Sequence, residues 1–322
     1  MKKILLIKTS SLGDVIHNLP VVNDVLRHYP GASIDWVVEE SFADIPRLHP
    51  KVNQVFTVAV RRWRKSIFKC DTWVQIRQFK QQLAAQQYDL VIDTQGLLKS
   101  ALMTLAANGI THGYDRHSIR EPLASCFYNH THAISYQQHA VNRNRTLVAL
   151  SGGYPPPTDA PDYGLSAQPL TQASTAQLPN TAYIVALHGT SRDSKLWPEA
   201  YWIALGQRLT ADGLQMLLPW ASTAEHLRAQ RIASSLQSAV VLPKCSIAQL
   251  AYIISKAKAA IGVDTGLSHL AAALDIPTIA LYTDTNPALT GVMAGAKVKA
   301  INLGNIDTTP SVDEVMKALN NL

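Results

Sequence analysis

The sequence of 322 residues has little cysteine, and several common chemical fingerprints are missing from it. Its three cysteines are scattered, with no C-x-x-C pair, which argues against a disulfide framework or a structural zinc and fits a reducing compartment. It contains no G-x-G, no G-x-x-x-x-G-K-[ST], no H-E-x-x-H and no G-x-S-x-G. The missing D-x-D pair weighs against a metal-held sugar-nucleotide site. No apolar run reaches about 18 residues, so no membrane span is expected.

Positive charge is concentrated in the first half of the chain. Residues 1–155 carry 18 Lys and Arg against 11 Asp and Glu, a net +7, whereas residues 156–322 carry 11 against 12, a net −1. The partners that suit the first half are therefore anionic: a nucleic acid, a membrane surface or an acidic substrate.

The first nineteen residues predict a binding site. An apolar strand over residues 3–8 runs through the polar turn TSSLGD into a helix that begins near Asn18, with Pro20 in its first turn. This is the opening half of a doubly wound sheet, in which ligands bind beyond the carboxyl ends of strands. The candidate residues are Lys8, Thr9, Ser10, Ser11, Gly13 and Asp14. The alternative is a polar loop in which Asp14 is only a helix cap.

The rest of the N-terminal half predicts strands over 34–38, 54–60 and 88–93 and helices over 71–87 and 137–150. Residues 61–69, RRWRKSIFK, carry five cations with Trp63, Ile67 and Phe68 among them. That composition suits nucleic acid, lipid headgroups or a phosphorylated glycolipid; the alternative is a solvated basic loop. Lys99 is a further candidate, near the start of the helix in a second strand–turn–helix unit. Arg116 and Arg120 lie in a loop predicted over 112–122, and His139 lies on the helix predicted over 137–150.

A segment rich in proline and glycine predicts a linker over 156–181, between an acceptor-binding domain over 1–155 and a second domain over 182–322. The second domain predicts strands over 182–188, 214–218, 259–263 and 278–282. Small residues follow the third of these strands and open a helix, so that the backbone amides near Thr265 and Gly266 form a candidate anion site. The last helix is expected either to belong to this domain or to pack back on the first domain.

The segments KTSSLGDVIH, RRWRK, DTQGLLKSA, REPLAS, HGTSRDSKLWP and VDTGLSHL together resemble the ADP-heptose:lipopolysaccharide heptosyltransferase family over nearly the whole chain. The resemblance implies the GT-B fold, an α/β architecture of two Rossmann-like domains facing across a cleft. It implies inverting, metal-independent transfer of L-glycero-D-manno-heptose from ADP-heptose to the inner Kdo of Kdo2-lipid A. ADP-heptose is then a substrate, and no cofactor is expected. Alternatives are heptosyltransferase II of the same family and a non-catalytic binder of anionic lipid or nucleic acid.

The resemblance also assigns roles to residues. Asp14 is the expected general base, and Lys195 is expected to neutralise the departing ADP. Asp264 is expected to face sugar hydroxyls or the backbone, and Glu225 to bind ribose unless it only caps a helix with Ser222. The donor residues are Thr190, Ser191, Lys195, Glu225, Cys245, Asp264, Thr265, Gly266 and His269. The acceptor residues are Lys8, Ser10, Ser11, Gly13, Arg61, Arg62, Arg64, Lys65, Lys99, Arg120 and His139.

The expected partners are ADP-heptose, Kdo2-lipid A and an anionic membrane surface, with no nucleic acid. The expected location is cytoplasmic, peripheral on the inner face of the inner membrane.

Overall fold

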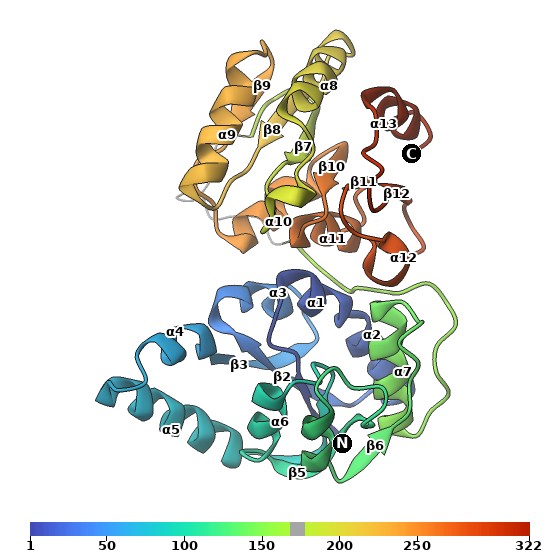
Figure 1. The fold of residues 1–322 in the computed structure, drawn as a ribbon. Helices are drawn as coiled ribbons and strands as arrows, with labels where there is room; N and C mark the ends of the chain where they lie inside the picture. The colour runs from blue at the N-terminus through green and yellow to red at the C-terminus, as the bar shows by residue number, and fades with distance from the viewer. Residues whose placement is uncertain (168–177) are drawn as a thin grey trace. The chain divides into compact units, whose positions relative to one another are not determined.

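A computed structural model describes residues 1–167 and 178–322. The chain forms two compact units, Met1–Gly164 and Leu165–Leu322 (Figure 1). Each unit has its own parallel sheet of six strands and its own helices, which confirms the predicted α/β class.

Unit 1 is built around strand β1. Its sheet has the order β3-β2-β1-β4-β5-β6, with every neighbouring pair parallel. The elements are β1 (Lys3–Ile7), α1 (Leu12–His17), α2 (Pro20–His28), β2 (Ser33–Glu39), α3 (Asp44–Arg47), β3 (Val52–Val58), α4 (Val60–Lys65), α5 (Cys70–Ala84), β4 (Gln87–Asp93), α6 (Leu98–Thr104), β5 (Asn108–Tyr114), β6 (His130–His132) and α7 (Ala140–Gly152), with 3-10 turns at Glu40–Phe42 and Pro122–Phe127.

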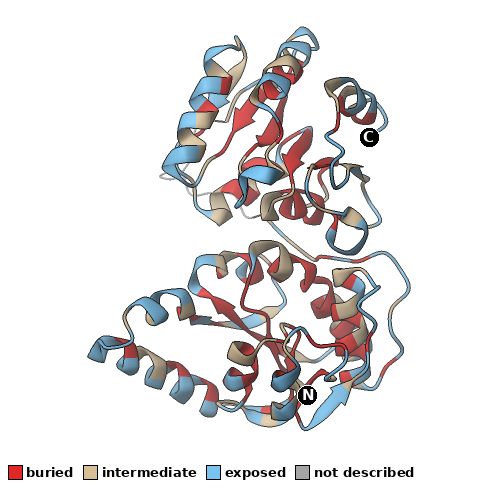
Figure 2. Ribbon diagram, in the orientation of Figure 1, coloured by how far each residue is buried: buried red, intermediate tan, exposed pale blue. Residues whose placement is uncertain are grey.

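The strand register places three turns side by side in unit 1. Ile7 of β1 pairs with Val37 on one side and with Asp93 on the other. The chain that leaves β1 therefore starts between the chains that leave β2 and β4, at the point where the strand order reverses. This is where doubly wound sheets bind ligands. The strands below it are buried, with Leu5, Ile7 and Val91 in one apolar cluster (Figure 2).

Unit 2 repeats this plan. Its sheet has the order β12-β11-β10-β7-β8-β9, all parallel, with β7 and β10 at the centre. The elements are β7 (Tyr183–Leu187), a 3-10 turn (Asp193–Lys195), α8 (Glu199–Ala211), β8 (Gln215–Leu218), α9 (Thr223–Ser234), β9 (Ala239–Val241), α10 (Ile247–Ser255), β10 (Ala259–Val263), α11 (Gly266–Ala273), β11 (Thr278–Tyr282), α12 (Pro287–Thr290), β12 (Ala300–Gly304) and α13 (Val312–Leu319).

The last helix belongs to unit 2. Val315 and Ala318 of α13 lie in the same apolar core as Trp197, Ile279 and Leu281. Of the two alternatives left open by the sequence, the structure therefore favours the second domain, because the apolar stripe of this helix lies in the core of that unit.

The predicted linker starts too early. Asp159 lies within the predicted range of 156–181, yet its backbone oxygen and one carboxylate oxygen accept hydrogen bonds from Arg145 at 2.6 and 2.8 Å. Its other carboxylate oxygen is 2.8 Å from Arg27. The chain up to Gly164 is thus part of unit 1. Residues 168–177 of the predicted linker lie outside the described residues.

Two further points in unit 1 differ from the sequence analysis. The alternative of a basic loop after β3 does not hold for its first part, because Val60–Lys65 form helix α4. The predicted loop over 112–122 begins inside strand β5, which continues to Tyr114. No helix in the described part of the chain is long and apolar enough to cross a bilayer.

Candidate active site

The turn after β1 fixes Asp14 in place. Asp14 stands in the first turn of α1, and its Oδ2 accepts hydrogen bonds from the backbone N–H of Ser11 at 2.7 Å and from the Ser11 hydroxyl at 2.9 Å. Asp14 is half-buried and Gly13 precedes it. Asp14 therefore does take part in the cap at the start of α1. Since both bonds end on Oδ2, capping does not occupy Oδ1, and the carboxylate is held in one orientation.

Gln95 supports this turn and was missed in the sequence. Its side-chain oxygen accepts from the backbone N–H groups of Thr9 and Ser10 at 3.0 and 3.1 Å. Gln95 is in turn positioned by Asp93, whose buried carboxylate accepts from its N–H at 2.8 Å and from the Tyr128 hydroxyl at 2.7 Å. Burial raises the pKa of Asp93, while these hydrogen bonds oppose the rise. The sequence did carry a signal for these two residues: Asp93 ends β4 and Gln95 follows it, and β4 is a neighbour of β1 in the sheet.

Lys8 is buried below the turn. Its ammonium group donates to the backbone oxygen of Thr94 at 2.8 Å, and burial lowers its pKa although the charges of Asp14 and Asp93 oppose the shift. The charges of Arg143 and Arg120 lower that pKa further. Lys8 supports the turn from below, and its predicted acceptor contact stays a prediction.

Lys99 and His139 reach the same turn from other elements. The Lys99 ammonium donates to the Ser10 hydroxyl at 3.0 Å, and burial lowers its pKa. His139 caps α7 by accepting from the N–H of Val141 at 3.2 Å, and its ring lies 5.6 Å from that of His17 in α1. The structure thus places Lys99 against Ser10 of the turn and His139 against His17 of α1, and the acceptor roles of Lys99, Arg120 and His139 stay predictions.

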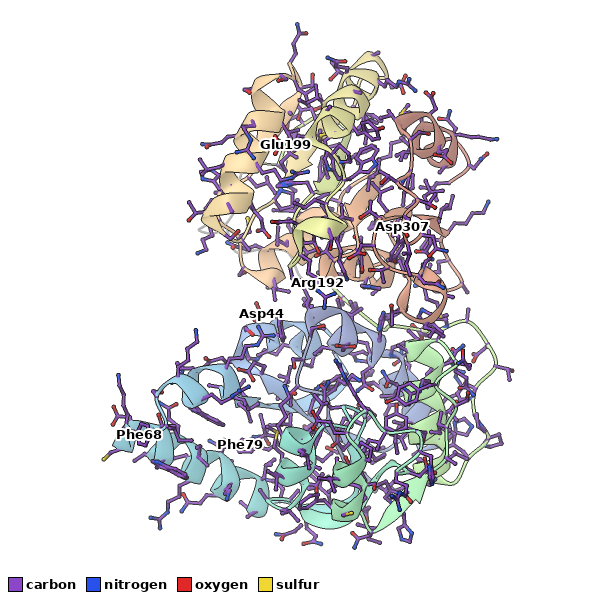
Figure 3. The ribbon with its side chains drawn as sticks, in the orientation of Figure 1. Asp44, Phe68, Phe79, Arg192, Glu199 and Asp307 are labelled. Atoms are coloured by element: carbon purple, nitrogen blue, oxygen red, sulfur yellow. The ribbon has the colours of Figure 1, made fainter. Side chains whose placement is uncertain are left out.

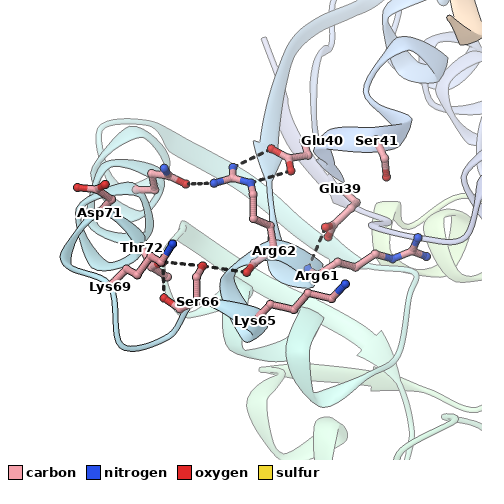
Figure 4. Close-up of a pocket in the computed structure, with 11 residues that line it drawn as sticks. Glu39, Glu40, Ser41, Arg61, Arg62, Lys65, Ser66, Lys69, Asp71 and Thr72 are labelled. Atoms are coloured by element: carbon pink, nitrogen blue, oxygen red, sulfur yellow. Dashed lines mark hydrogen bonds and ion pairs between the residues drawn. The ribbon is translucent and has the colours of Figure 1, made fainter.

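Three of the four remaining predicted acceptor cations line a separate pocket of about 710 Å³. The pocket lies between α4, the start of α5 and the end of β2 (Figure 4), and its lining includes Arg61, Arg62 and Lys65. Arg62 is paired with Glu40 at 2.9 and 3.1 Å, whereas Arg61 lies exposed over the Phe42 ring. Arg64 is exposed on the same helix.

In unit 2 the turn after β7 meets the start of α11. Lys195 forms an ion pair of 2.6 Å with the Asp264 carboxylate, and the Thr190 hydroxyl donates to the Asp264 backbone oxygen at 2.9 Å. The expectation that Asp264 faces sugar hydroxyls or the backbone was incomplete, because its carboxylate pairs with Lys195. Thr265 is the N-terminal cap residue of α11, which begins at Gly266. Ser191 is exposed, and His269 is buried on α11.

Glu225 does cap a helix. Its Oε2 accepts from the backbone N–H groups of Ala221 and Ser222 at 2.7 and 3.1 Å at the start of α9. Its other oxygen faces Gly189, where an added Cβ would come within 2.8 Å of Oε1. Glycine at 189 therefore leaves room for this carboxylate next to the turn after β7.

His188 directly follows β7 and was not singled out in the sequence analysis. It is fully buried, and burial lowers its pKa to about 4, with Arg228 adding to the shift and Glu225 opposing it. In the sequence, His188 could have been noticed because it stands directly before the polar turn that begins at Gly189. Cys245 lies half-buried, its thiol donating to the Pro243 oxygen at 3.2 Å, and burial raises its pKa.

Each unit therefore has an anchored polar turn at the carboxyl end of its sheet. Unit 1 offers an oriented carboxylate and cations, and unit 2 offers a lysine beside a helix N-terminus. Among residues 1–167 and 178–322, no cluster of three His, Cys, Asp or Glu side chains is arranged to hold a metal ion.

Comparisons with known proteins point one way. The family described as glycosyltransferase family 9 (heptosyltransferase) matches residues 76–320. Lipopolysaccharide heptosyltransferase 1 of Pseudomonas aeruginosa is 49% identical over 92% of this chain and 82% of its own length. The Escherichia coli K12 protein of that name is 47% identical over 90% of each chain. A solved structure, E. coli heptosyltransferase WaaC with ADP, is 43% identical, with a TM-score of 0.90 over 99% of each chain. This chain belongs to glycosyltransferase family 9, the heptosyltransferases.

Proposed function

We propose that this chain transfers L-glycero-D-manno-heptose from ADP-heptose to the inner Kdo of Kdo2-lipid A, an early step of lipopolysaccharide core synthesis. The observation that carries this is the oriented Asp14 carboxylate, held at 2.7 and 2.9 Å by Ser11 at the carboxyl end of β1. The identity of 49% to a protein named lipopolysaccharide heptosyltransferase 1 supports the choice of reaction.

Unit 1 supplies the base and the acceptor site. An acceptor hydroxyl attacks the anomeric carbon while Asp14 takes its proton, so a new C–O bond forms as the O–H bond breaks. Lys99, Arg120 and His139 near this turn are the residues that we propose to hold the Kdo carboxylate. The basic pocket with Arg61, Arg62 and Lys65, together with Arg64, is proposed for the lipid A phosphates, since phosphate oxygens accept hydrogen bonds from guanidinium and ammonium groups.

Unit 2 supplies the leaving-group site. The bond between the anomeric carbon and the diphosphate oxygen breaks, and ADP leaves with the electron pair. Lys195 and the free amides at the start of α11 stabilise the charge that builds there, and the Lys195–Asp264 pair sets the lysine in place before the donor binds. The solved relative with ADP-2-deoxy-2-fluoro heptose, 42% identical over 99% of this chain, supports this class of donor.

The enzyme is proposed to work in the cytoplasm, at the inner face of the inner membrane. The acceptor is a lipid, and the positive charge of residues 1–155 suits an anionic bilayer surface.

ADP release from ADP-heptose, with and without acceptor, tests the proposal. Release that depends on Kdo2-lipid A is expected, and it establishes both the transfer and the acceptor. Release with an already heptosylated acceptor alone would make the chain a heptosyltransferase II. A folded protein that releases no ADP with either acceptor would contradict the proposal and leave the non-catalytic binder.

A further inference from the structure

Four large apolar side chains are exposed together at one end of unit 1. Phe68 is 100% exposed, Ile67 43%, Trp73 57% and Val74 52%. We call these four residues the apolar tip. They lie where α4 turns into α5, and Figure 3 shows Phe68 at the outer end of this hairpin. Single exposed apolar residues are ordinary, but a cluster of consecutive ones calls for a partner.

The apolar tip is held in place by the turn beneath it. The Trp73 indole N–H donates to the backbone oxygen of Ile67 at 2.9 Å, and the Thr72 hydroxyl donates to the Ser66 oxygen at 2.7 Å. At the base of the hairpin, the Trp63 and Phe79 rings lie 6.5 Å apart against the core of unit 1. The exposure of Phe68 is therefore built into an anchored hairpin.

Cations outnumber acids in the hairpin that carries the apolar tip. Residues 60–84 contain seven Lys and Arg and one acidic residue, Asp71. On α5, Trp73, Arg77 and Lys80 follow each other at spacings of four and three, so they share one exposed helix face. Apolar and aromatic side chains with cations beside them are the pattern of segments that lie in the interface of an anionic bilayer.

We propose that the apolar tip inserts into the surface of an anionic lipid bilayer, with Arg77 and Lys80 on the headgroups. This inference rests on the proposed function, in which the acceptor is a lipid, and it names the surface that reaches the membrane. Lys65 and Lys69 belong to the same hairpin and line the basic pocket. Insertion of the tip therefore brings that pocket to headgroup depth, where the phosphates of a lipid acceptor lie.

Vesicle flotation tests this without catalysis. The full chain is mixed with vesicles of phosphatidylglycerol and phosphatidylethanolamine, or of phosphatidylcholine alone, all without acceptor. Binding to the anionic vesicles is expected. The variant Ile67→Ser/Phe68→Ser should bind them about ten to a hundred times more weakly, the change expected when a large apolar side chain returns to water. The matched control is Leu123→Ser, which replaces a side chain that is 68% exposed elsewhere in unit 1 and should change nothing.

A second pair of variants tests the charges. Arg77→Glu/Lys80→Glu should weaken anionic-vesicle binding by at least about fivefold for each cation lost. The control, Lys256→Glu/Lys258→Glu, makes the same change at exposed positions of unit 2 and should bind normally.

The outcomes separate this inference from the proposed function. If Ile67→Ser/Phe68→Ser floats like the unaltered chain, the inference is wrong. Light scattering tests the other possible partner of the apolar tip, a second copy of the chain. If the variant lowers the mass of the particle from dimer to monomer and vesicle binding is unchanged, the inference is also wrong. If the proposed function is right, Ile67→Ser/Phe68→Ser should release ADP at the normal rate with a deacylated, water-soluble acceptor. If neither this variant nor the unaltered chain releases ADP, the proposed function is wrong, while the flotation result still tests membrane insertion of the apolar tip.

Discussion

Asp14 combines an observed helix cap with the proposed role of general base. Capping of α1 fixes its side chain through Ser11, and the same fixation gives a general base one orientation. A base that is positioned in the free enzyme needs less ordering when the substrate arrives.

Asp14→Asn should separate the two tasks. An asparagine oxygen still accepts hydrogen bonds from Ser11, so the free energy of unfolding should change by less than about 1 kcal/mol. An amide cannot take the acceptor proton, so kcat should fall by about 10²–10⁴-fold. Steady-state ADP release and urea unfolding measure the two effects. Asp14→Ala should abolish transfer and yet leave polyanion binding nearly intact. A kcat within tenfold of the unaltered chain in Asp14→Asn would exclude Asp14 as the base.

Lys195 is predicted to act on the leaving group. Lys195→Gln should lower kcat by about 10²–10³-fold, because the charge that builds on ADP loses its nearest cation. Asp264→Asn frees Lys195 from its ion pair without removing it, and this variant should retain much more activity. Single-turnover ADP release compares them. Equal losses in the two variants would mean that the ion pair itself, rather than the lysine charge, matters.

His188 predicts a pH dependence of stability. An unfolded histidine has a pKa near 6.5, while burial holds that of His188 at about 4. Between these values the unfolded chain binds a proton that the folded chain does not, so the free energy of unfolding falls as the pH drops through this window. From about pH 7 to about pH 4.5 the loss from His188 is about 2–3 kcal/mol. His49 and His112 in unit 1 have the same lowered pKa, each mainly from burial, and add to the effect.

Urea unfolding at the two pH values checks this. His188→Gln should lower stability at neutral pH and flatten the pH dependence of unit 2, because the titrating group is gone. His49→Gln is the control that flattens the dependence of unit 1. If the free energy of unfolding of unit 2 depends on pH in His188→Gln as it does in the unaltered chain, the ring of His188 is protonated in the folded chain at low pH and the prediction is wrong.

At the scale of elements, the central strands of both sheets were predictable. AYIVALH, AAIGV and TIALY are short apolar runs between polar turns, and they form β7, β10 and β11 within a residue or two. The strands β6 and β9 were missed because each has three residues and is partly exposed at a sheet edge. β5 was missed because NGITHGY has two glycines and little alternation.

Helix α4 shows why the rest could not be predicted. The buried Glu39 carboxylate accepts from the backbone N–H groups of Val60 and Arg61 at 3.3 and 3.1 Å. Its cap is therefore an acid 21 residues earlier in the chain, which no local pattern reveals. The same holds for the site: Asp14 and Lys195 follow from resemblance, while the support from Gln95 depends on the pairing of β1 with β4.

Helix α9 offers a test that separates a cap from a ligand. Ser222→Ala removes only the hydroxyl that accepts from the Glu225 N–H, so it should cost about 1 kcal/mol of stability and leave ADP affinity unchanged. Glu225→Gln keeps an oxygen for the cap but loses the charge proposed for ribose hydroxyls. It should weaken ADP binding by about 10–100-fold. Calorimetric titration with ADP decides between them, and equal affinities in the two variants would leave Glu225 as a cap alone.

At the scale of the whole molecule, Arg145 links the end of unit 1 to its first helices. Its side chain is 1% exposed and pairs with the buried Asp24 of α2 at 2.7 Å while it binds Asp159 near the end of the unit. The chain after α7 is thereby tied to the first helices of the same unit.

Arg145→Met should destabilise unit 1 by about 3–5 kcal/mol, because Asp24 stays buried with only the more distant Arg27, at 4.0 Å, as an ionic partner. Asp159→Ala should cost much less, since that carboxylate is half exposed. Differential scanning calorimetry is expected to show a lower transition for unit 1 and an unchanged one for unit 2. A shift of both transitions by the same amount would mean that the two units unfold together.

The repeated strand order carries a consequence for how such chains diversify. Each unit completes its own sheet and its own core, and the boundary falls at Gly164 and Leu165. If the proposed roles of the two units hold, recombination at this boundary between family members would exchange nucleotide-sugar recognition as one piece and leave acceptor recognition behind. Chimeras joined there, with Asp159 kept on the side of its Arg145, are the natural route to new pairings of sugar and acceptor.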